Sequence, residues 1–148
     1  MLFSKSCIYA MRAVMGLAEL DEGVRKGGKE LAGLLEIPEP FLAKILQVLA
    51  KHRVITSAKG PNGGFFMTEA QRETPMIRVV EVVDGLHELK RCLMGIAACS
   101  HERPCPLHTS FAASRADICE QLKTRSILDM ARSNPANPIW TEEPASAS

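Results

Sequence analysis

The 148-residue sequence lacks any long uninterrupted apolar run. No stretch approaches the roughly 18 consecutive apolar residues that a membrane-spanning helix requires. Near the start, Arg12 interrupts the apolar segment 8–20, and no cleavage-site pattern of a signal peptide follows it. We therefore expect a chain that is not exported and has no membrane partner, and whose compartment is the reducing cytoplasm.

The signatures of several enzyme classes are also missing. The sequence has no Gly-x-Gly-x2-Gly fingerprint for a nucleotide, no Cys-x2-Cys redox pair, and no Ser/His/Asp or paired-carboxylate arrangement that stands out. We therefore expect that the protein is not an enzyme and has no small-molecule substrate. A thiol redox enzyme or an electron carrier is the alternative from a different class.

Neither sign of charge is in large excess, because the net charge is only +1. Its distribution is uneven: residues 1–63 carry a net charge of +3, and residues 64–148 carry a net charge of −2. A modestly basic first half is compatible with a surface that faces phosphate groups. With 46% hydrophobic and 24% charged residues, the composition is typical of a folded chain with its own core.

Apolar periodicity in the first half predicts three helices followed by a β-hairpin. The helices are expected over residues 5–20, 29–35 and 40–51. A β-branched run at 54–58, a Gly-rich turn and an aromatic run at 65–68 predict the hairpin. This order is that of a winged helix-turn-helix, with the second and third helices as the helix-turn-helix unit. The residues expected to be buried are Ile8, Met11, Met15 and Ala18 in the first helix and Leu42, Ile45, Leu46 and Leu49 in the third.

The third helix and the hairpin tip are candidate DNA-contacting elements. In a helix-turn-helix the second helix of the unit enters the major groove, and a Gly-rich turn can approach the narrow minor groove closely. Lys44 could donate to guanine and Gln47 could pair with adenine, although a solvated helix face would explain the same residues. Nearby cations, including Arg53, would displace counterions from phosphates. The residues expected to contact DNA are Pro40, Ala43, Lys44, Gln47 and Lys51 in the helix and Lys59, Gly60, Pro61, Asn62 and Gly63 in the hairpin.

Three of the five cysteines fall within fourteen residues, in the pattern Cys92-x6-Cys99-x5-Cys105-x2-His108. Thiolates and imidazole are ligands of iron–sulfur clusters, zinc and copper, and four such groups complete the protein bonds of a [2Fe–2S] or [4Fe–4S] cluster. A structural Cys3His zinc site needs the same atoms, and a set of free thiols is the simplest alternative. The other two cysteines lie on predicted helices and are expected to be small core residues, the first of them also a candidate alternative ligand: Cys7 and Cys119.

The second half is expected to be mainly helical. Residues 77–84 predict a helix, although their four valines would also suit a strand. A longer helix is expected over 107–124, with Leu107, Phe111, Ile118 and Leu122 on one side. We therefore divide the chain into a winged helix-turn-helix DNA-binding domain (1–85), a cysteine-rich loop (86–106), a helical region (107–131) and a tail (132–148) that we expect to be disordered.

Together these motifs resemble the Rrf-type family of bacterial winged-helix transcriptional regulators, the IscR/NsrR/RirA group, and within it the cysteine-containing iron–sulfur branch. The opening Ser4–Ala10 is similar to the family's Ser-Lys-x-x-x-Tyr-Ala. Residues 37–46 and 59–65 are similar to its recognition helix and wing, and the spaced cysteines fall where cluster-binding members carry theirs. The resemblance covers residues 1–131.

The resemblance implies a mainly α fold with a small β-hairpin, in which a winged helix-turn-helix is joined to a long C-terminal dimerisation helix at 107–124. It implies a homodimer that binds a palindromic operator in double-stranded DNA, as a repressor or an activator. It also implies an iron–sulfur cluster that controls operator affinity by sensing iron, iron–sulfur supply, redox state or nitric oxide. The same fold with a structural zinc, or with a metal-free thiol switch, is the alternative regulator.

Within that family, the segment Cys105-Pro106-Leu107-His108 is similar to the IscR pattern, in which three cysteines and one histidine hold [2Fe–2S]. NsrR-like members instead use a first-helix carboxylate of the partner subunit for [4Fe–4S], and Ile8 stands at that position here. The resemblance therefore favours [2Fe–2S] over [4Fe–4S]. Two departures are expected to matter: the first cysteine gap has six residues where five is commoner, and Pro40 and Ala43 replace polar base-reading residues of IscR.

Overall fold

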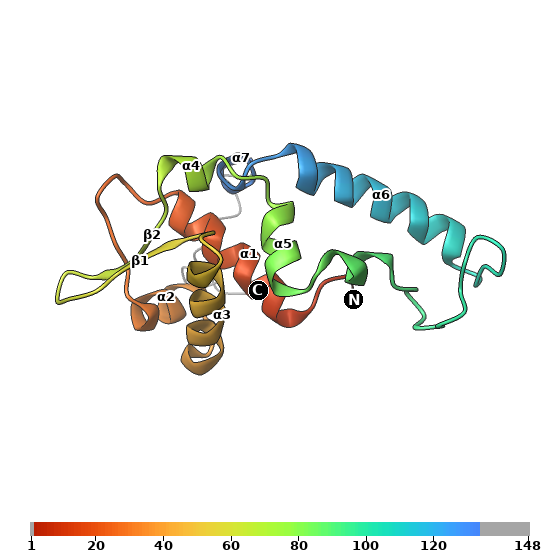
Figure 1. Cartoon of the computed structure of the whole chain (residues 1–148), viewed down its shortest axis with the longest axis horizontal. Coiled ribbons are helices and arrows are strands. Elements are labelled where there is room, and N and C mark those ends of the chain that lie inside the picture. The colour runs from red at the N-terminus through yellow and green to blue at the C-terminus, as the bar shows by residue number, and fades with distance from the viewer. Residues whose placement is uncertain (1, 134–148) are drawn as a thin grey trace, which may run out of the picture.

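Short helices surround one β-hairpin in this computed structural model, which describes residues 2–133 (Figure 1). This arrangement confirms the predicted mainly α fold with a small hairpin. In chain order the elements of the described residues are α1 (Lys5–Ala18), α2 (Gly28–Leu35), α3 (Glu39–Lys51), β1 (Thr56–Ala58), β2 (Gly64–Phe66), α4 (Glu69–Arg72), α5 (Ile77–Val83), the 3-10 helix η1 (Leu86–Lys90), α6 (His108–Thr124) and α7 (Ile127–Arg132).

The first helix, α1, lies in the centre of the core, and of its four residues predicted to be buried only Ala18 is fully so. It begins after Ser4, whose hydroxyl accepts the backbone N–H of Cys7 at 3.0 Å. Its fully buried side chains are mostly small: Cys7, Ala10, Ala13, Val14, Leu17 and Ala18. The larger Ile8, Met11 and Met15 are only half-buried. Small residues face the core because α3, α5 and α7 all pack against this one helix, which requires a close approach of their backbones.

The helix-turn-helix unit is formed by α2 and α3. The first of them ends at Glu36, whose left-handed backbone (φ 51°) turns the chain and returns its N–H to the carbonyls of Ala32 and Gly33. Pro40 then lies in the first turn of α3, where a missing N–H leaves no bond unmade. The predicted buried stripe of α3 is confirmed: Leu42, Ile45, Leu46 and Leu49.

The wing is an antiparallel pair of short strands, β1 and β2, with Ser57 opposite Phe65. A third segment joins it, because Lys26 and Phe65 exchange both backbone hydrogen bonds, at 3.1 and 2.7 Å. Gly64 permits this approach: its φ is +142°, and a Cβ there would lie 2.8 Å from the backbone of Lys26. The base of the wing is therefore fastened to the loop that precedes α2.

The remaining short helices are α4 and α5, which follow the wing, and α7, which ends the described chain. Residues 77–83 form the helix α5, so the strand alternative for this segment is wrong. The short helix α4 was not predicted; a reciprocal capping box between Thr68 and Gln71 defines it. The C-terminal α7 packs against α1.

The long helix α6 buries only one side chain, Leu122. On the side predicted to be apolar, Phe111 is half-buried, whereas Leu107 and Ile118 are 44% and 38% exposed. In Figure 1 the wing and the cysteine loop lie at opposite ends of the longest axis, with α6 leading back from the loop. The loop is therefore far from the DNA-contacting candidates of the same chain.

Two sequence expectations concern the chain ends and membranes. Arg132, which was assigned to the tail, is the last residue of α7, and the tail from residue 134 onward lies outside the described residues.

Among the helices of residues 2–133, none has the length and apolar character needed to cross a membrane.

The wing attachment generates a stability prediction. Gly64→Ala should lower the free energy of unfolding by about 1–3 kcal/mol, because it combines an unfavourable backbone conformation with a clash against Lys26. Gly33→Ala is the matched control: it lies in α2, and a Cβ there meets nothing within 4 Å. The free energy of unfolding of that variant should increase by about 0.5–1 kcal/mol. Urea unfolding of both variants measures the difference, and equal effects would contradict this account of the wing.

Candidate metal centre and nucleic-acid interface

The cysteine loop is built from tight turns that begin or end at a cysteine. The backbone N–H of Gly95 donates to the carbonyl of Cys92 at 2.9 Å, and that of Cys99 donates to Ile96 at 3.1 Å. At the far end, the N–H of His108 donates to the carbonyl of Cys105 at 3.0 Å. Turns place successive side chains on the inside of the loop, which brings residues distant in sequence to one point.

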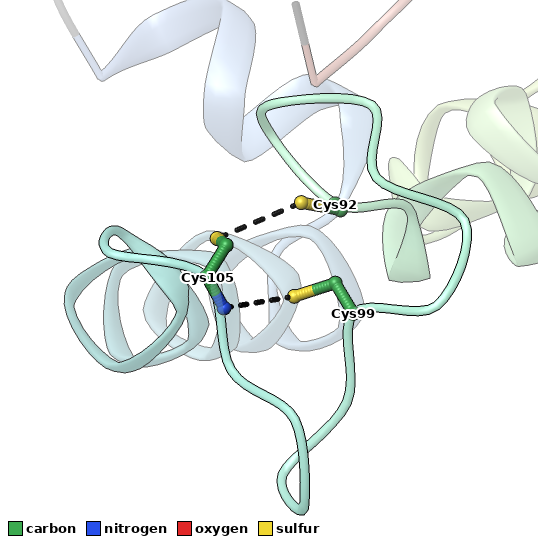
Figure 2. A group of neighbouring side chains, drawn as sticks. All are labelled: Cys92, Cys99 and Cys105. Carbon is green, nitrogen blue, oxygen red and sulfur yellow. Dashed lines mark hydrogen bonds between the residues drawn. The ribbon is translucent and has the colours of Figure 1, made fainter.

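The three thiols of this loop converge. Their sulfur atoms all lie within 4.8 Å of one another, and Figure 2 shows the three side chains turned toward a common space. The Sγ atoms of Cys92 and Cys105 are 3.7 Å apart, and the backbone N–H of Cys105 donates to Cys99 Sγ at 3.5 Å. The structure therefore brings together three of the four predicted ligands.

The fourth predicted ligand, His108, is the first residue of α6 and lies beside this group. Its Nδ1 is 3.2 Å from Cys99 Sγ, and its Nε2 is 3.2 Å from Nδ1 of His101. The sequence reasoning did not consider His101. Its position two residues after Cys99 was the only available signal, and nothing in the spacing showed that the two imidazoles would meet.

The thiols differ in their proton affinity. The pKa of Cys92 is lowered to about 7, first because its sulfur accepts a backbone hydrogen bond from Ile96, with Met94 and the neighbouring thiols adding to the effect. The Cys105 N–H lowers the pKa of Cys99, but partial burial and the two other thiols raise it by more, so the net shift is upward. Cys92 is therefore more readily deprotonated for metal binding than Cys99.

The geometry of these donors fits a soft or borderline metal. Two thiolates on one tetrahedral ion, each about 2.3 Å from it, lie about 3.8 Å apart. The 3.7 Å between Cys92 and Cys105 matches this separation. Three cysteines that close could therefore hold a metal ion or an iron–sulfur cluster.

The two cysteines outside the loop do not join this group. Cys7 has no exposed surface, and its pKa is raised to about 12, first by burial and then by the charge and hydrogen bond of Asp84. A thiol that stays protonated in the core is not available to a metal, so Cys7 is a core residue of this chain as expected. Cys119 is half-buried and packs against the same core.

The predicted DNA-contacting residues form an exposed surface of α3 and the wing. Phe41, next to them, is 61% exposed although it is aromatic. Gly63 is half-buried; the others are exposed: Pro40, Ala43, Lys44, Gln47, Lys51, Lys59, Gly60, Pro61 and Asn62. Four cations on or beside this surface form no salt bridge with an acidic side chain of residues 2–133: Lys44, Lys51, Arg53 and Lys59. Such a surface suits a phosphate backbone.

The helix-turn-helix, the wing and the separate cysteine loop define a winged-helix transcriptional regulator. The chain belongs to the Rrf2 family, described as an iron-dependent transcriptional regulator, whose match covers residues 3–133. It is 30% identical over 132 residues to a protein of Aquifex aeolicus described as an HTH-type transcriptional regulator, covering 88% of this chain and 91% of that one. It is also 31% identical over 84 residues to the regulator NsrR of Geobacillus kaustophilus, covering 57% of each chain. Homologues and family are transcriptional regulators, so the protein is not an enzyme.

Solved structures share the same fold. IscR of T. potens superposes with a TM-score of 0.66 at 20% identity, covering 90% of this chain and 88% of that one. CymR, the global cysteine regulator of B. subtilis, superposes with a TM-score of 0.65 at 18% identity, covering 88% of this chain and 96% of that one. The predicted winged-helix architecture is thereby confirmed.

Thiol reactivity provides a test of the site in the metal-free protein. Cys92 should react with iodoacetamide faster than Cys99 or Cys7, because only the thiolate attacks and the pKa of Cys92 is lowered to about 7. Its rate should rise as the pH increases through 7 and fall as thiolate is lost below it. Cys7 should remain unmodified in the folded chain, since it is buried and its pKa is about 12. Peptide mass spectrometry after short pulses measures both, and faster labelling of Cys7 than of Cys92 would contradict the described loop.

Proposed function

We propose that the protein is a homodimeric transcriptional regulator whose operator affinity is controlled by an iron–sulfur cluster bound to Cys92, Cys99, Cys105 and His108. The observation that carries this proposal is the convergence of the three sulfur atoms within 4.8 Å, beside the imidazole of His108. The family's description as iron-dependent supports iron as the metal. When bound, such a cluster supplies an electron-accepting centre that is damaged by oxidants and lost when iron is scarce.

The distances between the donors favour [2Fe–2S] over [4Fe–4S]. Cys92 and Cys105 form one close pair, with 3.7 Å between sulfurs, and Cys99 and His108 form a second, with 3.2 Å from sulfur to Nδ1. Two pairs of protein donors suit a cluster of two irons, each of which takes two protein ligands. One zinc ion with all four donors remains the second candidate, because three sulfurs that lie so close also suit a single tetrahedral ion.

The DNA-binding half of the proposal assigns α3 to the major groove and the wing tip to the minor groove. Lys44 and Gln47 project from the exposed side of α3 and would read base edges, while Pro40 and Ala43 would contact thymine methyl groups. The wing tip would place Lys59 and residues 60–63 against the neighbouring groove. Lys51 and Arg53 would contact phosphates.

A second copy of the chain would cover the apolar side of α6. Leu107 and Ile118 leave 44% and 38% of their surface exposed on this helix. Three further apolar side chains of the loop, Leu93, Met94 and Ile96, are about as exposed or more so. Pairing α6 helices would bury these side chains, and it would set two winged regions at a fixed spacing on a palindromic duplex.

The coupling between the cluster and DNA would run through α6. Arg115 of α6 donates to the carbonyl of Arg91, the residue before Cys92, at 3.4 Å. His108 begins the same helix, so any change in how the loop folds moves its first turn. A second connection leads through η1 to Asp84, which binds the backbone N–H of Ser4 at 2.9 Å at the start of α1. Loop order would therefore bias the position of α6 relative to α1 and the winged region that α1 belongs to.

The cluster and its effect on DNA can be measured together. Protein purified without oxygen should contain about two irons and two sulfides per subunit and absorb visible light. On a duplex selected from a random pool, two subunits should bind, and removing the metal should change the affinity by about 5–150-fold, which corresponds to a coupling of about 1–3 kcal/mol. A colourless protein that contains zinc, or an affinity that does not change on stripping, would remove the sensor function.

Cysteine variants separate the sensor from the zinc alternative. Cys92→Ala and Cys105→Ala should stay folded and bind DNA as the stripped protein does, because the winged core contains neither residue. A structural zinc would instead make both variants lose thermal stability. Cys119→Ala is the control, since its thiol lies outside the loop and should leave iron content unchanged.

The DNA surface can be tested with two lysines of equal charge. Lys59→Ala should weaken binding to every duplex and reduce the slope of log affinity against log salt by about 1 per subunit, because one cation that displaces counterions from the DNA is lost. Lys123→Ala removes the same charge from an exposed position on α6 and should change neither quantity. Fluorescence anisotropy at several salt concentrations measures the slopes, and equal losses for the two variants would contradict the proposed surface.

A further inference from the structure

His108 makes hydrogen-bond-length contacts through both ring nitrogens, and the two contacts differ in kind. Nδ1 faces a thiol, Cys99 Sγ, at 3.2 Å. Nε2 faces a second imidazole, with 3.2 Å to Nδ1 of His101. The two rings are nearly perpendicular, at 86° with centroids 4.8 Å apart, so the edge of His108 points at a ring nitrogen of its neighbour. His101 is exposed, whereas His108 is half-buried.

The position of His101 is fixed by the backbone. Ser100 and Arg103 exchange both backbone hydrogen bonds at 3.2 Å, and the N–H of Arg103 also contacts the hydroxyl of Ser100 at 3.1 Å. This closes a four-residue turn with His101 and Glu102 at its tip, directly between two of the cysteines. In Figure 2 the chain between Cys99 and Cys105 forms a narrow loop. The turn therefore places His101 where its ring can meet that of His108.

A ligand role for His108 determines where its proton is. A nitrogen that gives its lone pair to a metal carries no hydrogen, so ligation through Nδ1 requires the hydrogen on Nε2. That N–H then needs an acceptor, and Nδ1 of His101 is at the right distance. The hydrogen of His101 would lie on its own Nε2, toward solvent. All four ring nitrogens thus have consistent roles, and metal-binding histidines are commonly oriented by such an outer partner.

We propose that His101 is a positioning residue, which accepts the Nε2–H of His108 and thereby fixes the ring with Nδ1 toward the cysteines. This inference rests on the proposed function, because it concerns how the chain tunes its own fourth ligand. An acceptor on Nε2–H makes the imidazole a stronger electron donor. A stronger donor stabilises the oxidised form of an iron centre, so His101 lowers the reduction potential and slows the loss of iron.

The test compares full-length variants loaded with iron and sulfide without oxygen. His101→Leu removes the acceptor, whereas His101→Asn keeps an oxygen close to the position of Nδ1. Glu102→Gln alters the other tip residue of the turn, whose side chain forms no hydrogen bond with His108 in the described chain. His101→Leu should raise the reduction potential, shift the electron paramagnetic resonance spectrum of the reduced protein, and lower iron affinity against a chelator by about 10–100-fold. His101→Asn and Glu102→Gln should match the wild type.

The possible outcomes distinguish failure of the His101 role from failure of the proposed cluster-controlled function. An unchanged potential, spectrum and iron affinity in His101→Leu, with full iron content, overturns the inference alone. Nitrogen hyperfine coupling that survives in His108→Ala but disappears in His101→Leu also overturns it, because His101 would then be the ligand. Absence of iron and sulfide from all proteins, the wild type included, overturns the proposed function, and the positioning role with it.

Discussion

Three sulfur atoms lie within 4.8 Å of one another, and the repulsion between them as thiolates is the constraint on which the proposed regulation depends. Two unit charges about 4 Å apart repel by about 4 kcal/mol at the effective dielectric constant of a protein surface. Three thiolates at these distances therefore need a cation between them, and without one at least some must stay protonated. The loop is thus a segment with two electrostatic states, and the difference between them is the energy source that a metal-dependent regulator can use.

The fold separates this energy source from the DNA surface. The loop and the wing lie at opposite ends of the molecule, so a change at the cysteines cannot act on DNA by contact within one subunit (Figure 1). In the proposed mechanism it acts through helices, and α6 is suited to this because it starts at His108 and ends next to α7, which packs against α1. Leu122 is the one side chain that α6 buries in the described chain, which leaves the proposed second copy and the loop room to set the position of this helix.

Local sequence signals located most of the secondary structure. Pro40 and the leucine stripe of α3 act over one or two turns, so their pattern was sufficient to place the recognition helix and its buried face. On α1 the apolar periodicity identified Ala18 correctly but favoured Ile8, Met11 and Met15, whereas the crowded centre of the core selects small side chains. The valines of α5 were ambiguous for a similar reason: both a helix and a strand can bury them, and only the neighbouring helices decide.

The sequence by itself determined the order of the elements, the winged-helix class and the cysteines that are candidate ligands, because each depends on residue types at short spacing. Tertiary structure alone decided which ligands meet and how. The 3.7 Å between Cys92 and Cys105, the meeting of His108 with His101 and the fastening of Lys26 to the wing all depend on turns whose closure no periodicity encodes. Spacing fixes how far apart two residues can lie, whereas the backbone hydrogen bonds of the folded loop fix how close they come.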